Sequence, residues 1–215
     1  MNPTEPIWKS YIVETTGSIF TPQQCQMVID KGMSLKKETA SVGTRQKPEG
    51  GIDPKKRITS ISWIPFKDMP EMYRDIEATM LKANGNHFGF DGMKLTELAQ
   101  FTHYLEGGFY DWHMDNDVLG KYEPPVRKIS MTLLLSDPST FEGGELEFMS
   151  KGKTAKLKQG QAIFFASWLQ HRVKPVTIGE RKSLVMWFGG PSFKLLLNTI
   201  FQHLFIYKKF PTPWN

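Results

Sequence analysis

Two histidines and an aspartate supply the residue types of a metal site. His113 and Asp115 are separated by one residue, and His171 follows much later in the chain. Two imidazoles and one carboxylate form the facial triad of mononuclear non-haem Fe(II) sites, which leaves three coordination positions open. Side chains two residues apart on a strand project to the same side, so one extended segment can supply two of the ligands. The third ligand must come from a distant segment that folds back beside the first.

Two other residues compete for these ligand roles. His103 is an alternative third ligand, and Asp117 is an alternative carboxylate. On one strand, His103 would alternate with Tyr104 and therefore face the opposite side. We expect His103 to be a hydrogen-bonded histidine of the core or surface, and Asp117 to begin the loop that leads to Pro124.

The segment from residue 95 to 189 is a series of short extended stretches separated by turns. Residues 100–104 alternate as a strand, and residues 127–135 have the pattern of a buried strand that ends in a turn at Ser136-Asp137-Pro138. No long helical pattern interrupts this segment. Many short strands in succession indicate a sandwich or a barrel.

Two helices are expected before this β segment. Thr21 as N-cap and Pro22 at the first helical position predict a helix from Pro22 to Lys36. Its apolar stripe would contain Cys25, Val28, Ile29, Gly32 and Met33. A second helix is expected from Glu71 to Asn84, with Gly85 as its C-terminal stop.

The remaining segments are assigned from composition. Residues 40–56 are rich in Gly, Lys, Arg and Pro, which predicts a mobile loop that leads into a strand over residues 57–64. Residues 193–210 are expected to form a C-terminal packing helix.

Composition narrows the class of protein. The chain has 215 residues, of which 40% are hydrophobic, as expected for one globular domain. Its net charge of +5 is modest, so we expect a solvated surface and no nucleic-acid partner. Cys25 is the single cysteine and excludes an internal disulfide. Neither a signal-peptide pattern nor a membrane-spanning segment is present, which predicts a cytoplasmic protein.

Several motifs together resemble the Fe(II)- and 2-oxoglutarate-dependent oxygenases. Besides Tyr104 and H-x-D, they are Leu-Leu-Leu-Ser-Asp-Pro at 133–138, Glu-Gly-Gly-Glu-Leu at 142–146, Leu-Gln-His-Arg-Val at 169–173 and Gly-Glu-Arg at 179–181. More narrowly, they resemble the bacterial and phage prolyl-hydroxylase-like branch, the PKHD-type hydroxylases. The resemblance is dense over residues 95–192 and loose before them.

This resemblance implies a fold and a domain organisation. The fold would be mainly β with flanking helices, built on a double-stranded β-helix (jelly-roll) core. Residues 1–215 would form a single domain, with N-terminal helices and strands over 1–94 in support of a catalytic core over 95–192. Residues 193–215 would form a C-terminal helix and tail.

The resemblance also implies Fe(II), 2-oxoglutarate and O2, with ascorbate as a reductant. His113, Asp115 and His171 match the iron ligands. Arg181 matches the arginine that binds the distal carboxylate of 2-oxoglutarate, a role that suits its planar fork. Tyr104 matches a tyrosine that hydrogen-bonds the same co-substrate.

One part of the family pattern is missing from the co-substrate pocket. Some prolyl hydroxylases carry a second tyrosine and a threonine there, where this chain has Leu134 and Val185. The pocket would then rest more on Arg181 and Tyr104, with Leu146 packed along the co-substrate.

The implied reaction is hydroxylation of a polypeptide residue, proline first, with succinate and CO2 as co-products. Arg127 and Trp187 match residues that contact the substrate, and the loop at 40–56 would close over it. The alternatives are a lysyl residue, a small molecule, or a methylated nucleic acid. Nucleic-acid demethylases of this superfamily typically carry a second arginine at the position of Trp187, so they match less well. A binding protein without activity would not need open metal positions.

Overall fold

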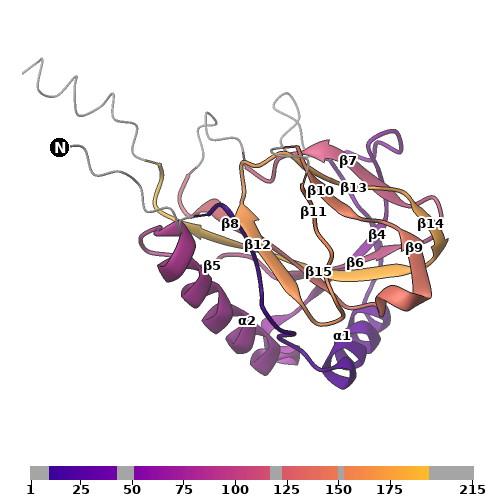
Figure 1. The fold of residues 1–215 in the computed structure, drawn as a ribbon, viewed down its shortest axis with the longest axis horizontal. Helices are drawn as coiled ribbons and strands as arrows, with labels where there is room; N and C mark the ends of the chain where they lie inside the picture. Colours follow the sequence, from indigo (N-terminus) through magenta and orange to yellow (C-terminus); the bar gives the residue numbers. More distant parts are fainter. Residues whose placement is uncertain (1–9, 43–50, 117–122, 150–152, 194–215) are drawn as a thin grey trace, which may run out of the picture.

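Two antiparallel sheets face each other, and two helices cover the outer face of the larger sheet (Figure 1). This arrangement is seen in a computed structural model of the chain that describes residues 10–42, 51–116, 123–149 and 153–193. The predicted fold class, mainly β with flanking helices, is confirmed.

The larger sheet has eight strands, and every neighbouring pair is antiparallel. In spatial order its strands are β1 (Ile12–Glu14), β12 (Ala162–Ala166), β8 (Val126–Leu134), β15 (Arg181–Gly190), β6 (Ala99–Tyr104), β4 (Ser60–Ile64) and β2 (Glu38–Thr39), with β5 (Lys94–Leu95) paired to β15. Strands from the N-terminal third therefore extend a sheet whose centre comes from the later part of the chain.

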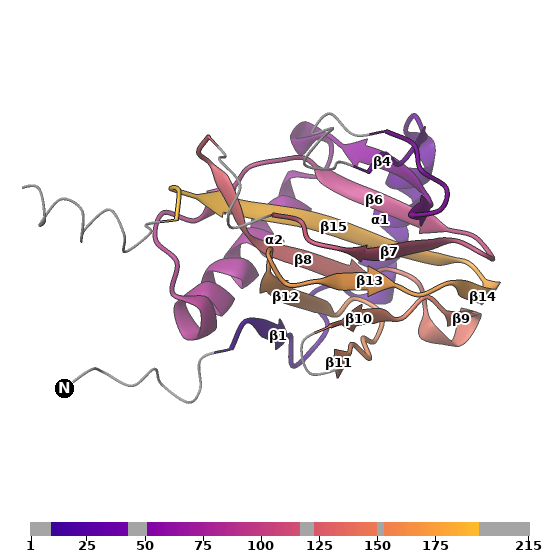
Figure 2. The ribbon, with the colours of Figure 1, turned by 90° about the horizontal axis from the view of Figure 1, so that it is seen from above.

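The smaller sheet carries the residues of most interest. Its strands are β11 (Lys153–Thr154), β10 (Leu146–Phe148), β13 (His171–Val173), β7 (Phe109–His113) and β3 (Arg57–Ile58), in this order. A separate ribbon of β9 (Phe141–Gly143) and β14 (Val176–Gly179) closes one end of the two-sheet core (Figure 2).

Helix α1 (Pro22–Ser34) begins where the sequence predicts. Thr21 Oγ1 accepts a hydrogen bond from the Gln24 amide at 3.2 Å, and the Gln24 side chain accepts one from the Thr21 amide at 2.9 Å. This capping box satisfies two amides that a helix N-terminus otherwise leaves open. The expected stripe is buried at Cys25, Val28 and Gly32, whereas Met33 is 37% exposed.

Helix α2 (Pro70–Ala83) does not end at Gly85 as expected. The chain continues through a π-helical turn (Asn84–Phe88) and leaves it at Gly89, whose φ of 70° is left-handed. The side chain of Asn84 explains the extension, because it bonds both the amide (2.9 Å) and the carbonyl (2.8 Å) of Phe90. Gly89 is therefore the residue that ends the turn.

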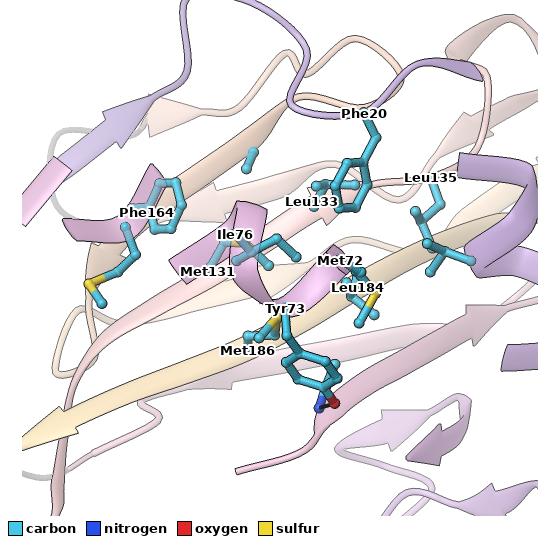
Figure 3. Packing of buried hydrophobic residues seen from close by; sticks show 14 of the residues in the cluster. Phe20, Met72, Tyr73, Ile76, Met131, Leu133, Leu135, Phe164, Leu184 and Met186 are labelled. Carbon is cyan, nitrogen blue, oxygen red and sulfur yellow. Dashed lines mark hydrogen bonds between the residues drawn. The ribbon is translucent and has the colours of Figure 1, made fainter. Parts of the chain in front are cut away.

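Side chains on the two faces of the larger sheet build two separate hydrophobic cores. On β12, Phe164 faces the helices, whereas Ile163 and Phe165 face the smaller sheet. Figure 3 shows the helix-side core, in which Ile76 of α2 packs near Met131 of β8. Full burial of a side chain such as Ile76 contributes about 1.5–3 kcal/mol to stability. The other faces of the same strands are thus available to line the space between the sheets.

Two boundaries differ from the sequence prediction. The strand expected over residues 57–64 divides at Thr59 into β3 and β4, which belong to different sheets. Thr59 is buried at this division and donates a hydrogen bond to the His103 carbonyl at 2.9 Å. The strand expected over residues 127–135 begins and ends one residue earlier, as β8 (Val126–Leu134).

Some expectations fall largely outside the described residues. Residues 43–50 of the expected loop are not described, but Val42 and Gly51 on either side of them form an antiparallel bridge. Of the expected C-terminal helix only Phe193 is described, and the division of the domain remains a prediction. Across the described ranges, no helix has the length and apolar character needed to cross a bilayer.

Candidate metal site and co-substrate pocket

His113, Asp115 and His171 converge between the two sheets. His113 ends β7 and is the direct Cα partner of His171, which begins β13. Asp115 lies just beyond the end of β7, where its amide donates to the Ser167 carbonyl at 2.9 Å. Its carboxylate oxygens lie 3.8 Å from His113 Nε2 and 3.6 Å from His171 Nε2. One ligand atom from each residue lies within 4.8 Å of the others, close enough to share one ion.

Both histidines present the same ring nitrogen to this centre. The Nδ1–H of His113 donates to the Asp111 carbonyl at 2.8 Å, and that of His171 donates to the Leu169 carbonyl at 2.9 Å. A carbonyl can only accept, so these bonds select the tautomer that leaves Nε2 free as a metal ligand.

Burial sets the protonation of the three groups. Together with the neighbouring His171, it lowers the pKa of His113 to about 3. Burial alone would raise the pKa of Asp115, but His171 and His113 hold it below its usual value. At neutral pH the site therefore presents a neutral His113 imidazole and a carboxylate. Two imidazoles and one carboxylate suit an Fe(II) ion that keeps open coordination positions. The roles of these three residues as metal ligands remain a proposal.

The rival ligands do not join this group. His103 faces away from Tyr104, and its Nε2 lies 2.9 Å from the Glu180 carboxylate. Burial lowers the pKa of His103. Asp117 lies outside the described residues.

Arg181 and Tyr104 are direct partners on neighbouring strands of the large sheet. The guanidinium carbon of Arg181 lies 5.7 Å from the Tyr104 ring centre. Only 3% of Arg181 is exposed, and no described carboxylate forms an ion pair with it. Buried charges in proteins are normally paired, so this arginine is suited to bind an anion.

Two hydroxyl groups extend the pocket beyond the expected pair. Arg181 Nη1 donates to Ser183 Oγ at 2.9 Å, and Thr102 Oγ1 lies 2.6 Å from the same oxygen. Ser183 and Thr102 are therefore hydrogen-bonded neighbours of the expected pair, and the role of Arg181 and Tyr104 in binding 2-oxoglutarate stays a prediction. Ser183 follows Arg181 by two residues, and this strand alternation was the signal that could have identified it.

Gly144 gives Arg181 its space. Its φ is +65°, and a Cβ atom there would lie 2.7 Å from Arg181 Cδ and 3.0 Å from Val176 Cγ2. Only glycine adopts this conformation without strain and also admits the arginine. Leu146, expected along the co-substrate, lines the same space as Arg181.

An arginine without an expected role lies near the metal site. The Tyr110 ring stacks on His113 with centroids 3.5 Å apart, and the Arg57 guanidinium lies 4.3 Å from the Tyr110 ring centre. Burial raises the pKa of Tyr110 to about 12, so the phenol stays protonated. Arg57 donates to Gln100 at 3.1 Å, but its Nε is buried without a partner among the described residues. No local pattern marks Arg57, because its position results from pairing between β3 and β7.

The structure brings Arg127 and Trp187 together. The Arg127 guanidinium lies 4.1 Å from the Trp187 ring centre and forms a bidentate pair with Glu97. Arg127 also lowers the pKa of Asp115, so this pair borders the metal site. The indole Nε1 of Trp187 is buried and has no partner in the described part of the chain. Their contact with a substrate remains a prediction.

Comparisons with known proteins identify related sequences over the β core. Residues 99–189 match the profile of the 2OG-Fe(II) oxygenase superfamily. A PKHD-type hydroxylase of Hyphomonas neptunium is 45% identical over 85 residues, 38% of each chain. One from Teredinibacter turnerae is 33% identical over 131 residues, 58% of each chain. The chain thus matches between about two fifths and three fifths of these relatives' lengths.

Solved structures share the fold. The viral collagen prolyl hydroxylase of Paramecium bursaria Chlorella virus-1 has a TM-score of 0.65 at 21% identity, covering 84% of this chain and 97% of that chain. A prolyl-4-hydroxylase of Pseudomonas putida has a TM-score of 0.60 at 20% identity, covering 84% of this chain and 92% of that chain. The expected jelly-roll core is therefore confirmed. Residues 99–189 thus carry both the match to the 2OG-Fe(II) oxygenase profile and the converging triad.

Proposed function

We propose that this protein is an Fe(II)- and 2-oxoglutarate-dependent dioxygenase that hydroxylates a polypeptide, with proline as the target residue. One observation carries the proposal: three potential ligands lie within 4.8 Å of one another, and the same core contains a buried arginine that lacks a carboxylate. The first group suits a metal and the second suits the distal carboxylate of a dicarboxylic acid.

Each residue of the site has a role in this proposal. His113, Asp115 and His171 would hold Fe(II), which when bound supplies O2-dependent oxidation of a C–H bond. One oxygen atom enters the hydroxylated product, and the other enters the succinate formed as 2-oxoglutarate loses CO2. Arg181, with Ser183 as its hydrogen-bond partner, anchors the co-substrate so that its other end faces the metal ligands. Ascorbate is included in the proposal as the reductant that restores Fe(II).

The choice of a polypeptide rests on the residues around the metal ligands. Arg57 Nε and Trp187 Nε1 are the two buried side-chain donors that lack a partner among the described residues. Unpaired buried donors are costly, and main-chain carbonyl groups of a substrate would satisfy them. The names of the similar structures favour proline, since they describe prolyl hydroxylases.

Incubation of peptides with the protein, Fe(II), 2-oxoglutarate, O2 and ascorbate tests the proposal. Matched peptides that carry proline, lysine or alanine at one position should be analysed by mass spectrometry for the gain of one oxygen atom, and succinate should be measured in parallel. We expect oxygen to be added to the proline peptide alone. Succinate formation together with oxidation of the lysine peptide would mean that lysine, and not proline, is the target residue. If Fe(II) binds but no succinate forms with any peptide, the dioxygenase proposal is wrong.

A chain with Asp115→Ala is the control for metal dependence. It should bind 2-oxoglutarate weakly and form neither product. This control separates turnover at the proposed site from oxidation by free iron.

A further inference from the structure

A groove of about 860 Å³ opens beside Arg181. Its walls come from β9, β10, residues 155–158 and the turn that contains Lys174 and Pro175. None of the three potential metal ligands lines it. Lys174 follows His171 by three residues, about 10 Å along an extended chain. Its lining residues place the groove beside β9 and β14. These two strands lie at the end of the core opposite the C-terminal end of β7, where His113 lies (Figures 1 and 2).

The groove carries a net positive charge. Four cations line it, namely Lys156, Lys158, Lys174 and Arg181, against the two carboxylates of Glu142 and Glu145, which leaves a net charge of 4 − 2 = +2.

The lysines of the groove are not equivalent. Lys174 lines the groove with its Nζ 3.5 Å from the carboxylates of both Glu145 and Glu147. Lys156 and Lys158 are exposed and form no ion pair with the described residues. An uncompensated positive cleft raises the local concentration of small anions.

Arg181 is the buried end of this groove. Although 97% of the residue is covered, it contributes to the wall beside Leu134 and Leu146. Its described polar partner, Ser183, is neutral. The volume lies within the range of about 300–1,000 Å³ that is typical of small-ligand pockets. A small carboxylate could thus approach the guanidinium without passing His113, Asp115 or His171.

We propose that this groove is a second, anion-selective entrance to the co-substrate pocket. A dicarboxylate of the size of 2-oxoglutarate enters here to reach Arg181, and succinate leaves by the same route while a polypeptide covers the metal side. The inference rests on the proposed function. It implies that 2-oxoglutarate can bind, and succinate can leave, either before or after the polypeptide binds.

Charge reversal at the mouth of the groove gives the first test. Lys156→Glu with Lys158→Glu is compared with Lys67→Glu with Lys82→Glu, which makes the same change in net charge at exposed positions outside the groove. Binding of 2-oxoglutarate to the Fe(II) protein, saturated with the proline peptide so that the metal side is covered, is followed by stopped-flow without O2. We expect association to slow by about tenfold or more in the groove variant relative to the control. The difference should close at high salt, where surface charges are screened.

Ala155→Trp gives a second test, because Ala155 is a small buried residue of the groove wall. A plug in a route slows association and dissociation by the same factor and leaves the equilibrium affinity unchanged. If neither substitution changes the rates relative to wild type and the control, the entrance is refuted even though equilibrium binding persists. If the wild-type chain binds no 2-oxoglutarate at all, the proposed function fails with it. Should Ala155→Trp not fold, the lysine variants decide.

Discussion

Gly144→Ala offers a direct test of how Arg181 is held. The new Cβ atom would lie 2.7 Å from Arg181 Cδ and 3.0 Å from Val176 Cγ2, so the arginine must move by several tenths of an ångström. The φ of +65° adds a backbone cost of about 1–2 kcal/mol for a residue other than glycine. Hydrogen bonds to charged groups contribute about 1.5–3 kcal/mol. Loss of one such bond would weaken 2-oxoglutarate binding by about ten- to a hundredfold.

Gly107→Ala is the matched control. Gly107 has a φ of +77°, but a Cβ atom there has no neighbour within 4 Å. Both variants should therefore lose similar stability from the backbone, as measured by urea unfolding. Only Gly144→Ala should lose affinity for 2-oxoglutarate, as measured by calorimetric titration of the Fe(II) protein without O2. Equal affinities in the two variants would show that Arg181 does not anchor the co-substrate or does not depend on Gly144.

Four further outcomes are expected. Asp115→Ala should abolish metal-dependent turnover while the unfolding midpoint changes little, and full 2-oxoglutarate turnover in this variant would contradict the triad. Arg181→Ala should raise the KM for 2-oxoglutarate by about tenfold or more without changing Fe(II) affinity, since it removes a charge-assisted bond; an unchanged KM would transfer the anchoring role to another cation. Burial lowers the pKa of His103 below its usual 6.5, so the native state resists protonation and stability should fall as pH drops below 6.5; urea unfolding across this range should show a smaller pH dependence for His103→Asn. Deletion of residues 48–52 should impair peptide hydroxylation but spare uncoupled 2-oxoglutarate turnover, and equal loss of both would mean that the loop supports the fold.

Local sequence rules were sufficient to predict the placement of residues that depend on a single strand or a single motif. The placement of His103 and Tyr104 on opposite faces followed from strand alternation, and the start of α1 followed from Thr21 and Pro22. The adjacency of Arg181 and Tyr104 was implied by the family resemblance, because it depends on the pairing of β6 with β15. These features are determined by local backbone geometry or by the topology that family members share.

Features that depend on tertiary contacts could not be predicted in this way. Arg57 approaches the metal site because β3 pairs with β7, although the two segments are about fifty residues apart. The end of α2 was placed at Gly85, but the side chain of Asn84 bonds a residue beyond it and extends the turn. The division of the strand at Thr59 depends on which sheet each half joins. None of these contacts leaves a periodic pattern in the sequence.

The hydrogen bonds that orient the two histidines have a consequence for evolution. Each ring donates to a main-chain carbonyl two residues earlier in its own segment, Asp111 for His113 and Leu169 for His171. No side chain takes part, so no single substitution elsewhere removes the acceptor. The walls around the site, including Arg57, can then change to suit a new substrate while the nitrogen offered to the metal stays the same. This separation would let one metal-binding framework acquire many specificities.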